Sequence, residues 1–392
     1  MKKSIFIIFL LIFALFFNVK PNFNDKTAFG VNKNAKEDTE SLKITAKSAL
    51  LLDYATNTIV YEKNSNERLP IASMTKIATL SIVLDSIDKG IIKENDVVTI
   101  SENAASVGGS TAFLDAGASY KVVDLIKTVV IASANDSSVA LAEFVSGSED
   151  VFVSKMNKLA SDLGLVDTHF ENATGLPVQN HYSTAHDIAK IYRTICNNSI
   201  YRRFSKIWME DFIHPSGRKT GLVNTNRLVK TFDGIEGGKT GYTDSAKFCL
   251  TASASRGSTR FIGVIIGAND SKTRFAEMTS LFGYGFANFE NKVIVNKNVP
   301  VTISKIKKSN VMIEIFPERD ASIFAKKSSE NKFTTDYKIN DVTAPVKKGN
   351  IVGKMFVFDK NNMVVDEVNL ISGTDAKKEN FKELLDKLVH SW

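Results

Sequence analysis

The sequence predicts an α+β protein with two folded domains, a larger one of mixed helices and strands and a small all-β one. Three observations favour this. Strand-like runs stand on both sides of a helical middle, which is typical of an α+β domain. Short β-branched runs follow one another closely after residue 290. The length of 392 residues fits two domains, or three, at about 100–200 residues each.

The composition excludes several classes of protein. Apolar residues make up 43% of the chain, which is enough for each domain to bury a core. The formal charge of +7 is modest and spread along the chain, and no arginine-rich or aromatic-interleaved segment predicts nucleic-acid binding. That charge is more consistent with an anionic envelope or lipid surface. Cys196 and Cys249 form no C-x-x-C pair, so we expect two buried free thiols, with a single bridge as the alternative.

The N-terminus has the form of a secretory signal peptide. A basic start precedes the apolar run Ile5–Phe17, and Ala28-Phe29-Gly30 fits a cleavage point. An uncleaved signal anchor is the alternative. Either interpretation places the rest of the chain outside the cytoplasm, so residues 1–30 are left out of the fold and residues 31–42 are expected to be a linker.

The larger domain is expected over residues 43–288. Ala49–Tyr54 and Thr58–Glu62 predict a strand hairpin. After the helix that begins near Pro70, the helical pattern returns in four segments, near 121–131, 136–146, 151–163 and 185–196. Strands over 248–255 and 261–267 and a closing helix over 272–287 complete an antiparallel sheet with a helical subdomain.

The stretch Leu69–Lys76 is the first candidate site. Pro70 suits a helix start, and the apolar run that follows is helical, so Ser73 and Lys76 are predicted on one face of the first turns. A serine hydroxyl is a weak nucleophile and needs a neighbouring base. A lysine amine can be that base only if burial or nearby positive charge lowers its pKa. The pattern Ser-x-x-Lys alone is weak evidence.

The small all-β domain is expected over residues 291–372, as a spacer or packing module without catalytic residues. An amphipathic helix is expected over 376–392, because its apolar residues recur at helical spacing. They are Phe381, Leu384, Leu385, Leu388, Val389 and Trp392. The helix is expected to lie in the membrane interface, with packing on the β domain as the alternative.

Three motifs in order carry the chemistry: Ser73-x-x-Lys76, Ser133-x-Asn135 and Lys239-Thr240-Gly241. This set resembles that of penicillin-binding proteins and class A β-lactamases. Together with segments such as Asn172–Pro177 and His181–Ala185, the chain resembles a low-molecular-mass penicillin-binding protein, a serine D-alanyl-D-alanine carboxypeptidase. The resemblance covers about residues 43–392. It departs where Asp115-Ala116 stands in place of an expected Lys-Pro.

The resemblance implies a β-lactamase/DD-peptidase-like transpeptidase fold and a penicillin-sensitive enzyme. Its substrate is expected to be a peptidoglycan stem peptide, and β-lactam antibiotics are expected as covalent inhibitors. Ser73 is the implied nucleophile, with its backbone N–H and that of Tyr242 as the oxyanion hole. Arg274 is implied near the substrate carboxylate. The remaining roles are Lys76 as base, Ser133 as proton relay, Asn135 as amide holder, and Lys239, Thr240 and Gly241 as carboxylate and backbone contacts.

The charge account is part of this hypothesis. A second lysine in the same cavity depresses the pKa of Lys76, so Lys76 is expected to be neutral because Lys239 is charged.

Other site classes fit less well. The run Gly234–Thr240 resembles a P-loop, but Asp233 occupies the position of the first glycine. His181 and His186 are five apart with no intervening glutamate, so no zinc site, no other metal and no cofactor is expected. His181 is expected to be a structural loop residue.

Two alternatives of function remain. One is a secreted serine β-lactamase, although the context of Glu171 does not resemble the deacylating glutamate of class A enzymes. The other is a non-catalytic wall-binding protein that keeps the fold.

Overall fold

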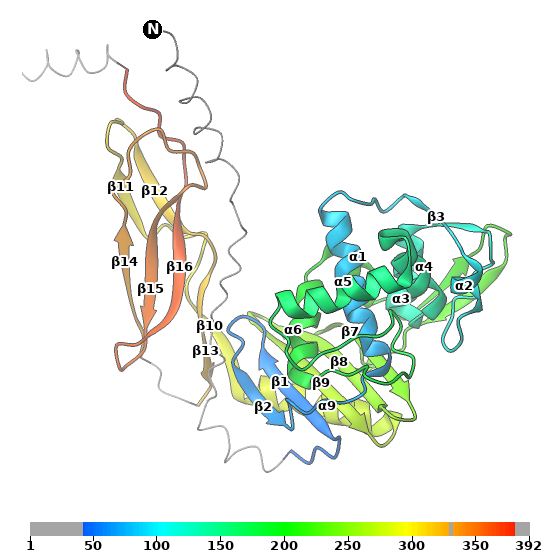
Figure 1. The fold of residues 1–392 in the computed structure, drawn as a ribbon. Coiled ribbons are helices and arrows are strands. Elements are labelled where there is room, and N and C mark those ends of the chain that lie inside the picture. Colours follow the sequence, from blue (N-terminus) through cyan, green and yellow to red (C-terminus); the bar gives the residue numbers. More distant parts are fainter. Residues whose placement is uncertain (1–41, 329–331, 381–392) are drawn as a thin grey trace, which may run out of the picture.

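The computed structural model describes residues 42–328 and 332–380. The expected signal peptide, almost all of the expected linker, and residues 381–392 of the expected terminal helix lie outside these ranges. The described chain forms a larger domain and a small β domain, which stand apart except for a two-stranded connection (Figure 1). The predicted α+β architecture is confirmed.

A five-stranded antiparallel sheet is the centre of the larger domain. Its strand order is β2-β1-β9-β8-β7, so the first strands of the domain pair with its last ones. The strands are β1 Ser48–Asp53, β2 Ile59–Lys63, β7 Ile235–Thr243, β8 Lys247–Arg256 and β9 Thr259–Ala268. Strand β7 is an edge strand, and it packs against segments of the helical subdomain.

Both faces of the sheet are buried, which explains the continuous apolar run in β1. Leu50 and Leu52 belong to the core under the helical subdomain, whereas Ala49 and Leu51 belong to the core under α9 (Ser271–Asn288). Side chains alternate between faces along a strand, so a strand covered on both sides needs apolar residues at every position.

Helices cover the other face of the sheet. In Figure 1 the helical subdomain lies beside the sheet, with α1 running through its middle. Its elements are a 3₁₀ turn Ala72–Thr75, α1 Lys76–Asp88, α2 Glu102–Ser106, α3 Val122–Ala132, α4 Asn135–Ser146, α5 Glu149–Asp162, α6 Ala185–Ile195, α7 Ser199–Ser205 and α8 Leu228–Thr231. The expected helices are confirmed within a few residues, and the Thr184 side chain caps α6 by accepting from the Asp187 N–H.

Several elements were not expected. Two small hairpins, β3–β4 and β5–β6, extend the helical subdomain, and α7 and α8 flank the second of them. Their strands are β3 Val97–Thr99, β4 Ser119–Lys121, β5 Met209–Ile213 and β6 Lys219–Val223. In β5 and β6 only one residue of each strand is buried, so the sequence offered little pattern there.

The small domain is a five-stranded antiparallel sheet joined to the larger domain by a ribbon of two strands. The ribbon pairs β10 Phe289–Val295 with β13 Ala321–Lys326, and Phe324 packs on Phe261 and Phe289. The sheet has the order β11-β12-β16-β15-β14. Its strands are β11 Thr302–Lys305, β12 Met312–Pro317, β14 Thr334–Ile339, β15 Ile351–Phe358 and β16 Val364–Ser372.

The described chain ends in an extended segment. Ala376 pairs with Val346 in a β-bridge, and residues 377–380 have no regular structure, so the expected helix does not begin at 376. Over the described ranges, none of the helices combines the length and the apolar character needed to cross a bilayer. Cys196 and Cys249 are buried and free, as expected.

Candidate active site

Ser73 lies in the one-turn 3₁₀ helix that leads into α1, rather than in α1 itself. Ala72 before it has a φ of 48°, a conformation that non-glycine residues adopt rarely. Lys76 is the first residue of α1. The expectation that one regular helix carries both residues is therefore corrected in detail, but the two side chains do meet.

The Lys76 amine is fully buried and has two hydrogen-bond partners. Its Nζ lies 2.9 Å from Ser73 Oγ and 2.7 Å from the carbonyl oxygen of Thr174. Burial lowers the pKa of Lys76 well below its ordinary value, and the charge of Lys239 lowers it further, against an opposing effect of Asp136. A neutral amine that donates to the carbonyl keeps its lone pair for the Ser73 hydroxyl.

Lys239 is the second buried lysine, and it comes from strand β7. Its Nζ donates to Ser133 Oγ at 2.7 Å and to the carbonyl oxygen of Thr240 at 2.9 Å. Burial lowers the pKa of Lys239 to about 7, and Arg274 contributes. The expected charge account is therefore corrected: burial is the first cause of the low Lys76 pKa, and Lys239 is itself near its titration point at neutral pH.

Ser133 and Asn135 occupy the tight connection between α3 and α4. Ser133 ends α3 with a φ of 64°, and Asn135 begins α4. The Asn135 amide nitrogen donates to the carbonyl oxygen of Gly108 at 2.6 Å, which fixes the amide orientation because a carbonyl only accepts. Its Oδ1 is buried and has no partner among the described residues. The site therefore presents an unpaired acceptor.

Gly241 brings the edge strand into contact with the nucleophile turn. A Cβ at this position would lie 2.8 Å from the carbonyl oxygen of Ile71 and 3.1 Å from the backbone nitrogen of Ser73. Only glycine permits this approach. Thr240 beside it is buried, while the Tyr242 side chain is half exposed and its hydroxyl donates to Asp244.

Arg274, on α9, lies behind the strand pair β7–β8. Its Nη1 donates to the carbonyl oxygens of Gly241 and Cys249 at 3.3 and 3.2 Å, and its Nε has no partner among the described residues. Burial lowers the pKa of Arg274 to about 10. The side chain is thus a buried cation, not a solvated residue of the helix surface.

The loop 170–183 supplies two groups that were not expected from the sequence, the Thr174 carbonyl and Gly175. Besides the Thr174 carbonyl, it contains Gly175, whose φ is 82° and where a Cβ would lie 2.0 Å from the carbonyl oxygen of Ala72. His181 Nε2 lies 2.7 Å from Thr75 Oγ1, and its Nδ1 accepts from the Glu171 N–H. The sequence marked this segment only through the resemblance, without a chemical role.

His181 is a neutral, buried link between this loop and the nucleophile turn. Thr75 Oγ1 donates to the carbonyl oxygen of Ala72, so His181 Nε2–H is the donor to Thr75. Burial is the largest cause that lowers the pKa of His181, to about 4. The expectation of a structural loop residue is confirmed.

The loop 108–118, where the sequence departs from the expected Lys-Pro, is tied to the same connection. The buried Asp136 carboxylate accepts from the N–H groups of Ala112 and Leu114. Asp115 forms a 2.8 Å ion pair with Arg218 of the β5–β6 hairpin. The hairpin therefore supports a loop whose carbonyl groups hold Asn135.

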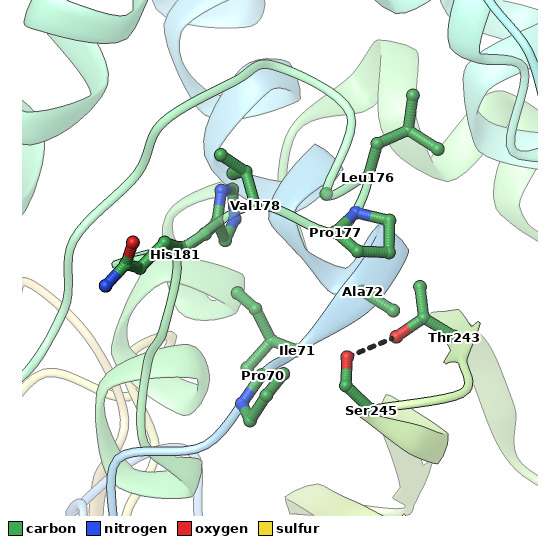
Figure 2. A pocket seen from close by; sticks show the side chains of 11 residues that line it. Pro70, Ile71, Ala72, Leu176, Pro177, Val178, His181, Thr243 and Ser245 are labelled. Atoms are coloured by element: carbon green, nitrogen blue, oxygen red, sulfur yellow. Dashed lines mark hydrogen bonds between the residues drawn. The ribbon is translucent and has the colours of Figure 1, made fainter.

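A pocket is lined by the residues that directly precede Ser73 in the chain and by two other segments (Figure 2). One wall is Pro70, Ile71 and Ala72 of the nucleophile turn, and the opposite wall is the loop from Gly175 to Gln179. Thr243 and Ser245, joined by a hydrogen bond of 3.2 Å, close a third side. The lining is mainly apolar, with a few hydroxyl groups at its edge.

This arrangement combines a serine, a buried amine that favours the neutral form, and a second buried lysine that takes up its charge near neutral pH. The described ranges hold no group of three His, Cys, Asp or Glu side chains suited to a metal ion. Neither buried lysine forms an ion pair with a carboxylate in the part of the chain that the structure describes. The site is therefore suited to nucleophilic attack on a substrate that brings its own negative charge.

Comparisons with known proteins agree with this chemistry. The family model described as D-alanyl-D-alanine carboxypeptidase matches residues 32–270, and that of the C-terminal domain of penicillin-binding protein 5 matches residues 289–378. The chain is 40% identical over 370 residues to D-alanyl-D-alanine carboxypeptidase DacF of Bacillus subtilis (strain 168), covering 93% of this chain and 95% of the relative. It is 30% identical to DacC of Escherichia coli (strain K12), with 88% of each chain covered.

Solved structures give the same result for the whole architecture. Penicillin binding protein 5 from Haemophilus influenzae matches with a TM-score of 0.68 at 30% identity, covering 86% of this chain and 98% of that one. Penicillin binding protein 6B from Escherichia coli matches with a TM-score of 0.67 at 27% identity, covering 88% and 99%. Both domains of the fold are therefore shared with these proteins.

Proposed function

The chain belongs to the D-alanyl-D-alanine carboxypeptidase family of serine hydrolases, and on that premise we propose that Ser73 is the residue that the substrate acylates. The activity is hydrolysis of the bond between two terminal D-alanine residues of a peptidoglycan stem peptide. The observation that carries the residue assignment is the 2.9 Å contact between Ser73 Oγ and the buried Lys76 amine.

Acylation begins when neutral Lys76 accepts the Ser73 hydroxyl proton and Ser73 Oγ attacks the carbonyl carbon of the penultimate D-alanine. The negative charge on the carbonyl oxygen is stabilised by the backbone N–H groups of Ser73 and Tyr242. The contact of Gly241 with the Ser73 backbone supports this, since it brings the two backbones side by side.

Collapse of the intermediate breaks the C–N bond, and the leaving D-alanine nitrogen takes a proton. Ser133 relays that proton from Lys76, and the Lys239 amine, which donates to Ser133 Oγ at 2.7 Å, holds the Ser133 hydroxyl in place. The unpaired Asn135 Oδ1 accepts from the substrate amide N–H. Water then attacks the ester with Lys76 again as base, releasing the shortened peptide and restoring Ser73.

The terminal carboxylate of the substrate pairs with Lys239 and the Thr240 hydroxyl. Two buried cations that lack a carboxylate partner in the described ranges support this role, because an anion would offset the cost of burying them. Arg274 acts from behind the strand through the Gly241 carbonyl and its own charge. The pocket beside Ile71 takes the part of the stem peptide that becomes the acyl group.

The enzyme binds β-lactams as a member of a penicillin-binding family. A β-lactam carbonyl is attacked by Ser73 as the peptide carbonyl is, and the ring nitrogen stays tethered, so the acyl-enzyme is released slowly. A secreted β-lactamase, the closest alternative, would release it quickly.

We further propose that the protein is exported by residues 1–30 and works at the outer face of the cell membrane, held there by residues 376–392. The basic and apolar start of the sequence and the helical spacing of the apolar residues 381–392 support this location.

Intact-protein mass spectrometry tests the function and the nucleophile together. The purified chain is expected to gain the mass of one penicillin, and a pentapeptide ending in D-Ala-D-Ala is expected to lose one D-alanine. Ser73→Ala should abolish both, whereas Ser245→Ala, a hydroxyl of the neighbouring pocket, should keep the adduct. No D-alanine release from any such peptide would favour a wall-binding protein, and rapid loss of the penicillin adduct would favour a β-lactamase.

A further inference from the structure

The end of the small domain that lies farthest from the larger domain carries a group of lysines that the reaction does not use. Six exposed lysines belong to it, and we call them the basic end: Lys307, Lys308, Lys347, Lys348, Lys377 and Lys378. They come from three segments that are distant in sequence. Their clustering is therefore a property of the fold and not of a charged run.

Backbone hydrogen bonds hold these three segments together. Ala344 N–H donates to the carbonyl oxygen of Lys307 at 2.9 Å, and Glu379 N–H donates to that of Lys308 at 2.9 Å. The bridge between Val346 and Ala376 joins the remaining pair. The exposed lysines therefore stand on segments that the backbone joins at one end of the sheet.

The lysines of the basic end outnumber the carboxylates around them. Lys307 pairs with Asp341, whereas the other five lysines make no ion pair within the described ranges. The same segments carry three carboxylates, Asp341, Asp375 and Glu379, against six lysines. An excess of positive charge remains at the surface.

Exposed apolar side chains accompany the lysines. Met312, Ile351 and Val311 lie at the same end of the sheet and are 56%, 53% and 38% exposed. Strand register places them there, because β12 and β15 begin where β11 and β16 end. Lysines mixed with exposed apolar side chains are typical of surfaces that lie on a bilayer interface.

The basic end and the larger domain lie at opposite sides of the small domain, so the basic end is free to contact a bilayer. The larger domain attaches through the β10–β13 ribbon, and the described chain ends at the opposite side of the small domain (Figure 1). From Asn380 the sequence continues into the segment with apolar residues at helical spacing, so that segment starts next to the basic end.

We propose that the basic end is a lipid-contacting surface that binds the phosphate headgroups of anionic phospholipids. The proposal rests on the extracytoplasmic location given above, but it concerns residues 305–380 and not the tail. We favour anionic lipid over a soluble phosphate polymer because of the exposed apolar side chains Met312 and Ile351. A bilayer interface can bury these side chains, whereas a polar polymer cannot. The small domain then holds the active site away from the membrane in a fixed direction.

The test is vesicle flotation of the full chain. The test variant carries Lys→Gln at Lys308, Lys347, Lys348, Lys377 and Lys378. A matched control carries Lys→Gln at five exposed lysines of the larger domain: Lys43, Lys47, Lys93, Lys121 and Lys206. Both variants lose the same net charge. Vesicles contain phosphatidylcholine alone or with about a third phosphatidylglycerol.

We expect the test variant to bind anionic vesicles at least about tenfold more weakly than the unchanged chain, since each lysine near an anionic surface contributes severalfold. The control should differ by less than about twofold, and binding should weaken as salt rises. Equal binding by the test variant and the unchanged chain would overturn the proposal. So would tighter binding to a soluble phosphodiester polymer than to vesicles.

A chain truncated after Asn380 separates this proposal from the tail. Residual, salt-sensitive binding of the truncated chain to anionic vesicles, lost on adding the five substitutions, would support the basic end. If truncation removes all binding while the five substitutions change nothing, the tail alone is the anchor and this proposal is wrong. If D-alanine release also fails, the proposed function fails separately.

Discussion

In the larger domain Lys76 and Lys239 are buried, whereas in the small domain Lys347 and Lys348 stand in solvent. All four residues are lysines and carry the same primary amine. Burial shifts the pKa of Lys76 far down and that of Lys239 to about 7. The difference teaches that the fold, by removing water from one pair, turns a surface cation into a base and an anion receptor.

The largest expected effect comes from removing the base. Lys76→Gln should lower kcat/KM for a D-Ala-D-Ala peptide by about 10⁴-fold, because Ser73 loses its proton acceptor. Lys348→Gln should leave kcat/KM unchanged within about twofold. Steady-state release of D-alanine measures both. Similar losses of kcat/KM in the two variants would contradict the claim that buried and exposed lysines differ in function.

The second effect concerns the carboxylate partner. Lys239→Gln should lower kcat/KM by about 10²–10³-fold, as the loss of a buried charge contact does. Because its pKa of about 7 means that Lys239 is charged below pH 7 and neutral above, kcat/KM should fall as pH rises past 7.

Lys239→Arg sharpens this prediction. Arginine stays charged at all relevant pH values, so the decline in kcat/KM should move to higher pH. The measurement is the pH profile of kcat/KM for the unchanged chain and for both variants. If kcat/KM of Lys239→Arg declined at the same pH as that of the unchanged chain, the decline would have to come from the titration of another group.

The third effect is on stability. The pKa of His181 is lowered to about 4 in the folded protein, below its ordinary value of 6.5. The folded state therefore binds fewer protons, and the free energy of unfolding should fall as pH drops from about 6.5 to 4, by roughly 3 kcal/mol in total. Urea unfolding at several pH values checks this. His181→Gln should flatten the dependence, and an equally steep dependence in that variant would contradict the assignment.

The smallest effect is expected on the small domain. Lys354 and Glu367 form an exposed ion pair across β15 and β16. Lys354→Gln should change the free energy of unfolding by no more than about 0.5 kcal/mol, since exposed pairs contribute little. It should leave D-alanine release unaltered. A loss above about 2 kcal/mol would mean that surface charge matters to folding here.

The sequence allowed the two-domain architecture to be predicted, because it depends on local signals. The three-residue spacing predicted that the side chains of Ser73 and Lys76 meet, and they do, although Ser73 lies in a 3₁₀ turn and not in α1. The tight connection at Ser133 and Asn135 was also marked by its residues. The free, buried state of Cys196 and Cys249 followed from their isolation in the sequence.

Features that arise from packing between distant segments were not predicted. The Thr174 carbonyl that fixes the Lys76 amine is 98 positions away in sequence, and no local pattern marks it. The expected effect of Lys239 on the pKa of Lys76 is present, but burial is the larger cause, and the sequence does not show how deeply a side chain is buried. Strands β5 and β6 were missed because their faces are mostly exposed.

The central claim is that burial makes Lys76 the neutral base for Ser73. Its most direct test is the pH dependence of the rate at which penicillin acylates Ser73, followed by intact mass, in the unchanged chain and in Lys239→Gln. The acid limb is the pH range in which the acylation rate rises as Lys76 loses its proton. We expect it to lie well below pH 10.5 in both chains. In Lys239→Gln it should lie at only slightly higher pH than in the unchanged chain. An acid limb near pH 10.5 in the unchanged chain would contradict the claim. A limb that reaches pH 10.5 only in Lys239→Gln would show that charge, and not burial, controls the base.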